Sequence, residues 1–85
     1  MKLKIISTND TIFDGEVTSV TLPGAKGRFM VLHNHASIVS TLIRGKITYT
    51  PIDSTKGNSD AKQEEIEVGG GIVDVDNNIV SVCIF

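Results

Sequence analysis

His33 and His35, two histidines separated by one residue, are the side chains whose type and spacing best suit chemistry. Residues i and i+2 of a β-strand project from the same face, so two imidazoles at this spacing could share a transition metal. They are the only histidines of the chain. Two nitrogens without a nearby carboxylate make a poor metal site, because protein metals usually take three or four protein ligands. We therefore predict that both histidines lie at the surface or in a turn and bind no metal.

The spacing Gly27-x5-His33-x-His35 is similar to the first half of the motif of the cupins, a family of small β-barrels. That motif continues with a glutamate, where this chain has Val39 and Ser40, and later supplies another histidine, which this chain lacks. The alternative function that this resemblance implies is a small cupin-like metal-binding β-barrel that uses His33 and His35.

Neither a catalytic nucleophile nor a phosphate-binding loop is evident elsewhere. Cys83 is the only cysteine, which excludes a disulfide framework and is typical of a reducing compartment. No helical segment follows Gly69-Gly70-Gly71 to hold a phosphate at its N-terminus, so this run is predicted to be a sharp crossover between two strands. The chain is thus predicted to have no catalytic residue and no cofactor.

The charge balance and the aromatic content argue against a nucleic-acid partner. Eight basic and ten acidic residues are spread along the chain without a block of like charge, and 5% of the residues are aromatic. No apolar run approaches the roughly 18 residues of a membrane-spanning helix. A hydrophobic fraction of 40% indicates a globular chain, and its length indicates a single domain, residues 1–85.

Short runs rich in Ile, Val and Thr, separated by Gly, Asn, Asp and Ser, predict β-strands throughout. Residues 12–22 are predicted as one long strand with a bulge at Gly15, residues 28–32 as a strand covered on both sides, and Asn77-Asn78 as a tight turn. Residues 53–62 are predicted as an exposed hairpin loop. The further predicted strands are residues 2–7, 37–43, 46–50, 63–68, 72–75 and 79–85. Seven to ten short strands indicate an all-β fold, either an antiparallel β-sandwich or a flattened barrel.

A set of spaced residues runs through the chain in this order: Phe13-x-Gly15-x-Val17, Val20-x-Leu22-Pro23-Gly24-x-x-Gly27, Val31-Leu32-x-x-His35-Ala36, Gly45, Gly70-Gly71-Ile72-Val73-x-Val75 and Asn78-x-Val80-x-Val82. The set resembles the N-terminal domain of the ε subunit of the F-type proton-translocating ATP synthase, the counterpart of the mitochondrial δ subunit. The resemblance covers essentially all 85 residues. It implies a β-sandwich of about ten strands, which agrees with the strands predicted from the residues.

The resemblance also implies a non-catalytic part of the rotor, at the foot of the central stalk. Such a subunit binds the γ subunit and the c-ring of Fo and couples proton flow to ATP synthesis. The implied location is peripheral, on the cytoplasmic face of the bacterial plasma membrane, as part of F1. By position, one end of the domain is expected to contact the c-ring, through Gly24, Lys26, Gly27, Arg28, His35 and Ala36.

The chain departs from the family pattern in three places. Family members usually have Pro-Gly-His-Ala-Pro where residues 33–37 are His-Asn-His-Ala-Ser, so this turn is expected to be less rigid. They usually have an acidic residue shortly after Gly27, where this chain has Arg28, so the facing c-ring loop is expected to carry a compensating change. They commonly continue into a helical hairpin that can block ATP hydrolysis, whereas this sequence ends at Phe85, so inhibition of that kind is expected to be absent.

Overall fold

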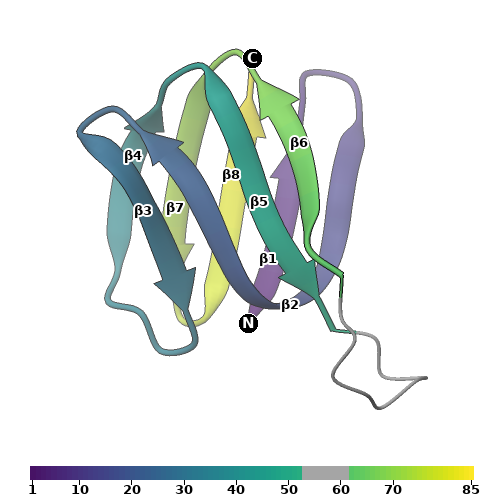
Figure 1. The fold of residues 1–85 in the computed structure, drawn as a ribbon, viewed down its shortest axis with the longest axis vertical. Coiled ribbons are helices and arrows are strands. Elements are labelled where there is room, and N and C mark those ends of the chain that lie inside the picture. Colours follow the sequence, from purple (N-terminus) through teal and green to yellow (C-terminus); the bar gives the residue numbers. More distant parts are fainter. Residues whose placement is uncertain (53–61) are drawn as a thin grey trace.

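Eight β-strands in two facing layers make up the described part of the chain, residues 1–52 and 62–85, in a computed structural model (Figure 1). The strands are β1 (Lys2–Ile6), β2 (Thr11–Gly24), β3 (Gly27–Leu32), β4 (Ile38–Leu42), β5 (Gly45–Pro51), β6 (Glu64–Val68), β7 (Gly71–Asp76) and β8 (Ile79–Ile84). None of the described residues is helical. The predicted all-β sandwich is therefore confirmed, with eight strands in place of about ten. The loop predicted at residues 53–62 lies, except for Lys62, outside the described residues.

The longest strand, β2, belongs to both layers and joins them. Its first half pairs with β1, and its second half pairs with β3 and β5. One layer holds β4, β7, β8 and β1, and the other holds β3, β2, β5 and β6 (Figure 1). The pairs are antiparallel except for β1–β8, which is parallel. The prediction of one long strand in this part of the chain is confirmed.

Gly15 is not the site of a bulge, contrary to the sequence-based prediction. It lies in regular antiparallel pairing opposite Leu3, and the register of β2 against β5 shifts instead between Val17 and Ser19. A Cβ atom at position 15 would lie 3.2 Å from the ring of Phe13, which is tighter than an ordinary contact. Space for that ring, rather than an irregular backbone, explains the glycine.

Alternating side chains from both layers fill the space between them. The rings of Phe13 and Tyr49 pack together with their centroids 4.5 Å apart. Burial of Tyr49, and to a smaller extent the carboxylate of Glu64, raises the pKa of the Tyr49 hydroxyl. Buried and exposed positions alternate along β1 and β8, whereas in β5 Thr48 is buried between Ile47 and Tyr49. The buried apolar residues of the described chain form one cluster: Leu3, Ile5, Val17, Val20, Leu22, Val31, Leu42, Ile47, Tyr49, Val68, Val73, Val75, Val80 and Val82.

The strand β3 is covered on one side, where the sequence predicted cover on both. Val31 is fully buried, whereas Met30 and Leu32 are 53% and 52% exposed. The reason is that the described strands form two layers only, so the outward side chains of β3 have no further layer to pack against. Among the described residues nothing packs on its outer face, so the apolar run at residues 28–32 does not mark a central strand.

Two connections follow the turn chemistry of the sequence. The β7–β8 turn has Asn77 and Asn78 at φ values of 50° and 61°, the left-handed pair that two-residue hairpins favour. The β6–β7 connection crosses from one layer to the other through Gly69 and Gly70, and Gly70 has a φ of 147° that side chains rarely adopt. Both the tight turn and the crossover are confirmed.

Candidate interaction surface

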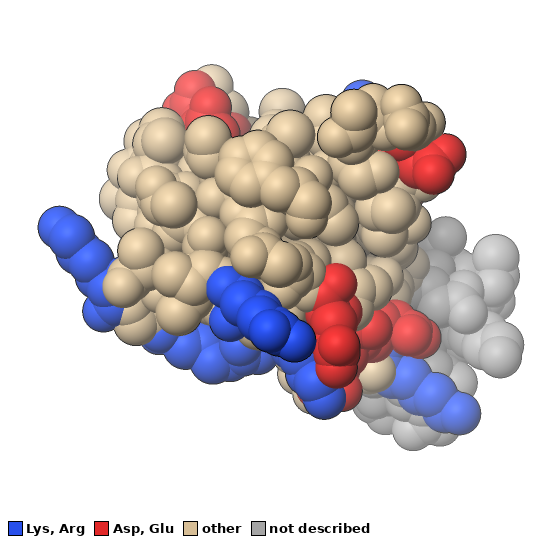
Figure 2. Space-filling model, turned by 90° about the horizontal axis from the view of Figure 1, so that it is seen from above, with Lys and Arg blue, Asp and Glu red and all other residues tan. Residues whose placement is uncertain are grey.

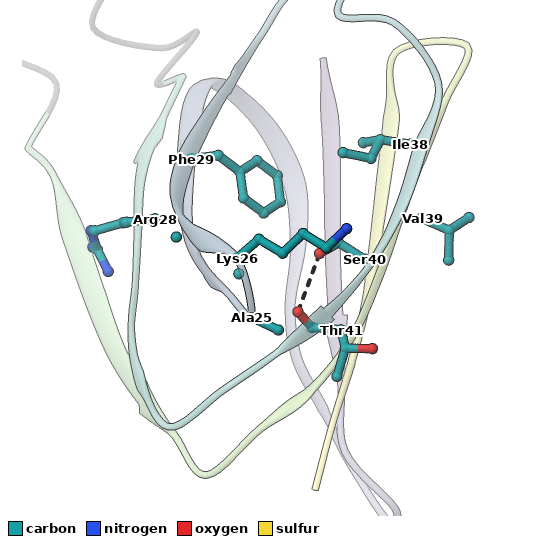
Figure 3. A pocket seen from close by; sticks show the side chains of 10 residues that line it. Ala25, Lys26, Arg28, Phe29, Ile38, Val39, Ser40 and Thr41 are labelled. Carbon is teal, nitrogen blue, oxygen red and sulfur yellow. Dashed lines mark hydrogen bonds between the residues drawn. The ribbon is translucent and has the colours of Figure 1, made fainter.

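A groove of about 580 Å³ lies between β3 and β4, where the two layers diverge. Residues 24–29 form one wall and residues 38–41 the other. Figure 3 shows the side chains of Phe29 and Ile38 on opposite sides of the groove, with Lys26 extending across it toward β4 and Arg28 pointing away. The layers meet at one end of the groove, where Gly24 pairs with Leu42. The groove is therefore an opening along the side of the sandwich.

The side chain of Arg28 lies on β5 instead of pointing outward as a free charge. The last β2–β5 pair in this direction is Thr21 with Thr48, and the same register continued would place Leu22 opposite Ile47 and then Pro23 opposite Lys46. Proline has no N–H, so β2 offers no donor to the carbonyl of Lys46. The Arg28 guanidinium supplies one, with Nη1 2.7 Å from that carbonyl oxygen and Nη2 3.0 Å from the Thr48 hydroxyl. Arg28 thus braces β3 to β5 across β2.

Lys26 is the cation of this turn that remains available to a partner. It occupies, with Ala25, the two-residue turn between β2 and β3, and its side chain is exposed. Within residues 1–52 and 62–85 it forms no ion pair and no side-chain hydrogen bond, in contrast to Arg28. The family resemblance placed a positive charge for contact with the ring at Arg28. Because the Arg28 guanidinium is bound to β5, Lys26 is the cation that is more accessible to a partner.

His33 and His35 lie beyond the end of β3, so they do not share a strand face as their spacing suggested. His33 is exposed and His35 half-buried. The His35 amide donates to the carbonyl of Leu32 at 3.1 Å, which closes a turn. His35 Nδ1 lies 2.6 Å from the carbonyl oxygen of Ala36, so this nitrogen carries the proton. The prediction of turn histidines is confirmed.

No group of three or more His, Cys, Asp or Glu side chains is placed to hold a metal ion in the described parts of the chain. The two histidines thus have no third ligand there, and the geometry gives no support to the cupin-like alternative.

The six residues expected to contact the c-ring do not lie at one end of the domain. Gly24, Lys26, Gly27 and Arg28 stand at the start of β3, whereas His35 and Ala36 follow its other end (Figure 1). A six-residue strand separates the two groups by about 17 Å, at roughly 3.4 Å per residue. The expectation of a single end is therefore wrong. The two groups lie apart because the whole length of β3 extends between the β2–β3 turn and the β3–β4 loop.

The outer face of the β4–β7–β8–β1 layer carries exposed apolar side chains beside charged ones such as Lys4 and Asp74, which no sequence pattern had singled out. Cys83 stands beside Ile6 and Ile72 in neighbouring strands, and Ile72 is 47% exposed. These residues border a second groove, of about 380 Å³, whose lining also includes Lys4, Asp74 and Ser81. Val39, on β4, is exposed on the same face. The signal in the sequence is the apolar residues out of phase with the buried positions, Ile72 beside Val73 and Ile79 beside Val80. We call this surface, made by Ile6, Val39, Ile72, Ile79 and Cys83, the apolar outer face.

Charged side chains also stand on the second layer. Figure 2 looks onto the end that carries the β2–β3 turn, and there most basic side chains lie along one margin with some of the acidic ones, while other acidic side chains stand apart from it and most of the surface carries no charge. Lys46 on β5 is paired in register with Glu67 on β6, and both are exposed. The charged margin thus includes the layer whose outer face carries Arg28.

Residues 1–84 match the sequence model of the β-sandwich domain of the ATP synthase Delta/Epsilon chain. The chain belongs to this family. The ATP synthase epsilon chain of Aliarcobacter butzleri is 40% identical over 82 residues, which cover 96% of this chain and 59% of that protein. The epsilon chain of Wolinella succinogenes is 42% identical over 82 residues, which cover 96% and 57%. The chain thus spans somewhat more than half the length of these curated relatives.

Two solved structures contain a chain with the same fold as this protein. A chain of the Euglena gracilis mitochondrial ATP synthase, in a structure of OSCP, F1 and the c-ring, matches with a TM-score of 0.79 and 20% identity over 96% of this chain and 48% of that one. A chain of the Tetrahymena thermophila mitochondrial ATP synthase central stalk and c-ring matches with a TM-score of 0.76 and 15% identity over 99% and 62%. At these identities the likeness shows the fold.

The described residues contain no helix with the length and hydropathy needed to cross a membrane. The match of residues 1–84 to the Delta/Epsilon β-sandwich model confirms the family resemblance inferred from the sequence.

Proposed function

We propose that this chain is a non-catalytic rotor subunit of a proton-translocating ATP synthase, which binds the γ subunit and the c-ring and couples proton flow to ATP synthesis. The observation that carries this proposal is the match of residues 1–84 to one β-sandwich family whose curated members are ATP synthase epsilon chains. Residues 1–85 act as a single domain that needs no cofactor. As part of F1, the subunit is peripheral to the cytoplasmic face of a bacterial plasma membrane.

The connectivity of β2 suits a part that must transmit torque. Because β2 pairs with β1 in one layer and with β3 and β5 in the other, the layers cannot slide without breaking its backbone hydrogen bonds. A packed core between the layers adds resistance, since close-packed interiors transmit strain. A stiff sandwich transmits the rotation of the ring to γ, whereas a flexible joint would lose part of the torque.

The c-ring contact runs along β3 in this proposal. The expected residues, Gly24, Lys26, Gly27, Arg28, His35 and Ala36, stand at both ends of β3, so a partner that touches all of them must lie beside the strand. Met30 and Leu32, half-exposed between the two ends, would then be covered by the ring. The available charge is that of Lys26, and the facing loop of the ring is therefore acidic.

The γ subunit binds the apolar outer face. An exposed apolar surface bordering a groove is typical of protein–protein contact sites. This face is formed by strands of the layer opposite β3, so γ and the ring occupy different sides of the sandwich. A rotor part that is held on one side and driven from another requires such a separation.

Copurification with γ tests the proposed function. Tagged γ, coexpressed with the untagged full chain, is expected to retain it, whereas an unrelated β-sandwich of similar size is not retained. The assembled complex is expected to synthesise ATP in inverted membrane vesicles only when the chain is present. A folded chain, verified by its far-ultraviolet circular dichroism, that γ does not retain would overturn the proposal.

A further inference from the structure

Two asparagines 44 positions apart in the sequence hold the turn that carries His35. The amide N–H of Asn34 donates to Oδ1 of Asn78 at 2.6 Å, and Nδ2 of Asn78 donates to Oδ1 of Asn34 at 3.0 Å. A third hydrogen bond, from the hydroxyl of Ser37 to Oδ1 of Asp76 at 2.9 Å, joins the same two segments. The β3–β4 loop is thus tied to the β7–β8 turn at three points.

The backbone of both asparagines is set for this contact. Asn34 has a φ of 64° and Asn78 a φ of 61°, in the left-handed region that asparagine adopts more readily than other side chains. The carbonyl of Asn78 also accepts the amide of Lys2 at 2.9 Å. The receiving turn is therefore fixed to β1, and through Asn78 the loop is fixed to the body of the sandwich.

We propose that this pair, the Asn34–Asn78 clasp, positions His35 for contact with the ring, so that both asparagines act as positioning residues. The inference rests on the proposed function, in which His35 and Ala36 contact the c-ring. Within the loop itself, the recorded hydrogen bonds of His35 go to Leu32 and Ala36. These local bonds shape the turn but do not fix it relative to the sheets. The clasp does so, because it joins the residue next to His35 to a strand pair of the opposite layer.

Glycine substitutions separate the side-chain bonds from the backbone conformation. Asn78→Gly removes both bonds of the clasp, and Asn34→Gly removes one, while glycine adopts a positive φ without strain. Asn77→Gly is the matched control: Asn77 lies in the same turn at a φ of 50° and forms no side-chain hydrogen bond within residues 1–52 and 62–85. Asn34→Asp keeps an oxygen that accepts from Asn78.

Amide hydrogen exchange measures the clasp directly in the full chain. One hydrogen bond changes a local opening equilibrium about fivefold, so the Asn34 amide is expected to exchange at least about fivefold faster in Asn78→Gly. In Asn77→Gly its rate is expected to match the wild type. Equal rates in all three proteins would overturn the inference.

Proton-driven ATP synthesis in inverted vesicles, with retention on γ as the second measurement, tests the positioning role. Asn78→Gly is expected to lower ATP synthesis about threefold or more while γ retains the subunit normally, since only the orientation of the loop changes. Asn34→Gly is expected to give a smaller loss, which Asn34→Asp restores. Equal loss of synthesis and of γ binding would show that the asparagines merely stabilise the sandwich, and would overturn the inference.

His35→Ala distinguishes failure of the inference from failure of the proposed contact. Loss of synthesis in both His35→Ala and Asn78→Gly, with Asn77→Gly unaffected, supports the inference. Loss in His35→Ala alone overturns the clasp and leaves the contact in place. Normal synthesis in His35→Ala overturns the proposed contact, and with it the role of the clasp, whatever Asn78→Gly does. If Asn78→Gly fails to fold, Asn34→Gly and its rescue by Asn34→Asp decide the same question.

Discussion

The two outer faces of the sandwich differ in chemistry although both are made by strands with the same alternation. On the β4–β7–β8–β1 layer the outward positions include Ile6, Ile72 and Cys83 in adjacent strands. On the second layer the outward positions of the central strands are polar, and the half-exposed apolar side chains lie on the edge strand β3. Burial in the core thus accounts for one side of each strand, and the contacts proposed above with γ and the ring would account for the other.

The largest expected effect comes from placing a carboxylate on the apolar outer face, and the same change on β3 serves as its comparison. Ile72→Glu is expected to weaken binding of γ at least about tenfold, because burying an unpaired carboxylate at an apolar contact costs about 2 kcal/mol or more. Met30→Glu is the matched variant, because Met30 is 53% exposed and Ile72 47%. It is expected to leave γ binding unchanged. Titration of γ with each folded variant measures the difference, and equal affinities would remove the distinction between the faces.

A smaller effect separates the two cations near the β2–β3 turn. Arg28→Met is expected to lower the free energy of unfolding by about 1 kcal/mol, because it removes the hydrogen bonds to Lys46 and Thr48 at an exposed site. Lys26→Met is expected to change it by less than about 0.5 kcal/mol. Urea unfolding of the two variants tests this assignment. If Lys26→Met is the more destabilising, Arg28 does not brace the layer.

The smallest effect concerns the core between the faces. The pKa of Tyr49 is raised above its ordinary value of 10.0 in the folded chain, first by burial and then by Glu64. Its stabilising contribution is therefore fully present below pH 10 and is lost as the pH rises from there through the folded pKa, because the unfolded chain releases this proton first. Unfolding midpoints measured from pH 8 to pH 11 are expected to fall more steeply for the wild type than for Tyr49→Phe. Parallel curves would contradict the shift.

Most of the fold was predictable because its signals are local. Alternation along β1 and β8 identifies the buried residues, for instance Leu3 and Val80, without knowledge of their partners. The Asn77-Asn78 turn was likewise predictable, since asparagine tolerates the left-handed backbone. The candidate surface was predictable only in part. Its residues came from the family resemblance, and the strand predicted at residues 28–32 already separates them into two groups, whereas the partners of Arg28 on β5 became visible only in the tertiary structure.

The sequence alone determined the all-β class, the strand positions and the family, because alternation, turn residues and spaced glycines are properties of the chain itself. The tertiary structure decided that no described element covers the outer face of β3, and so why Met30 is exposed although its neighbours are apolar. It also decided the partners of Arg28 and Asn34, which lie 18 and 44 positions away. Such contacts depend on how the layers are paired and stacked, and local preferences carry no information about that arrangement.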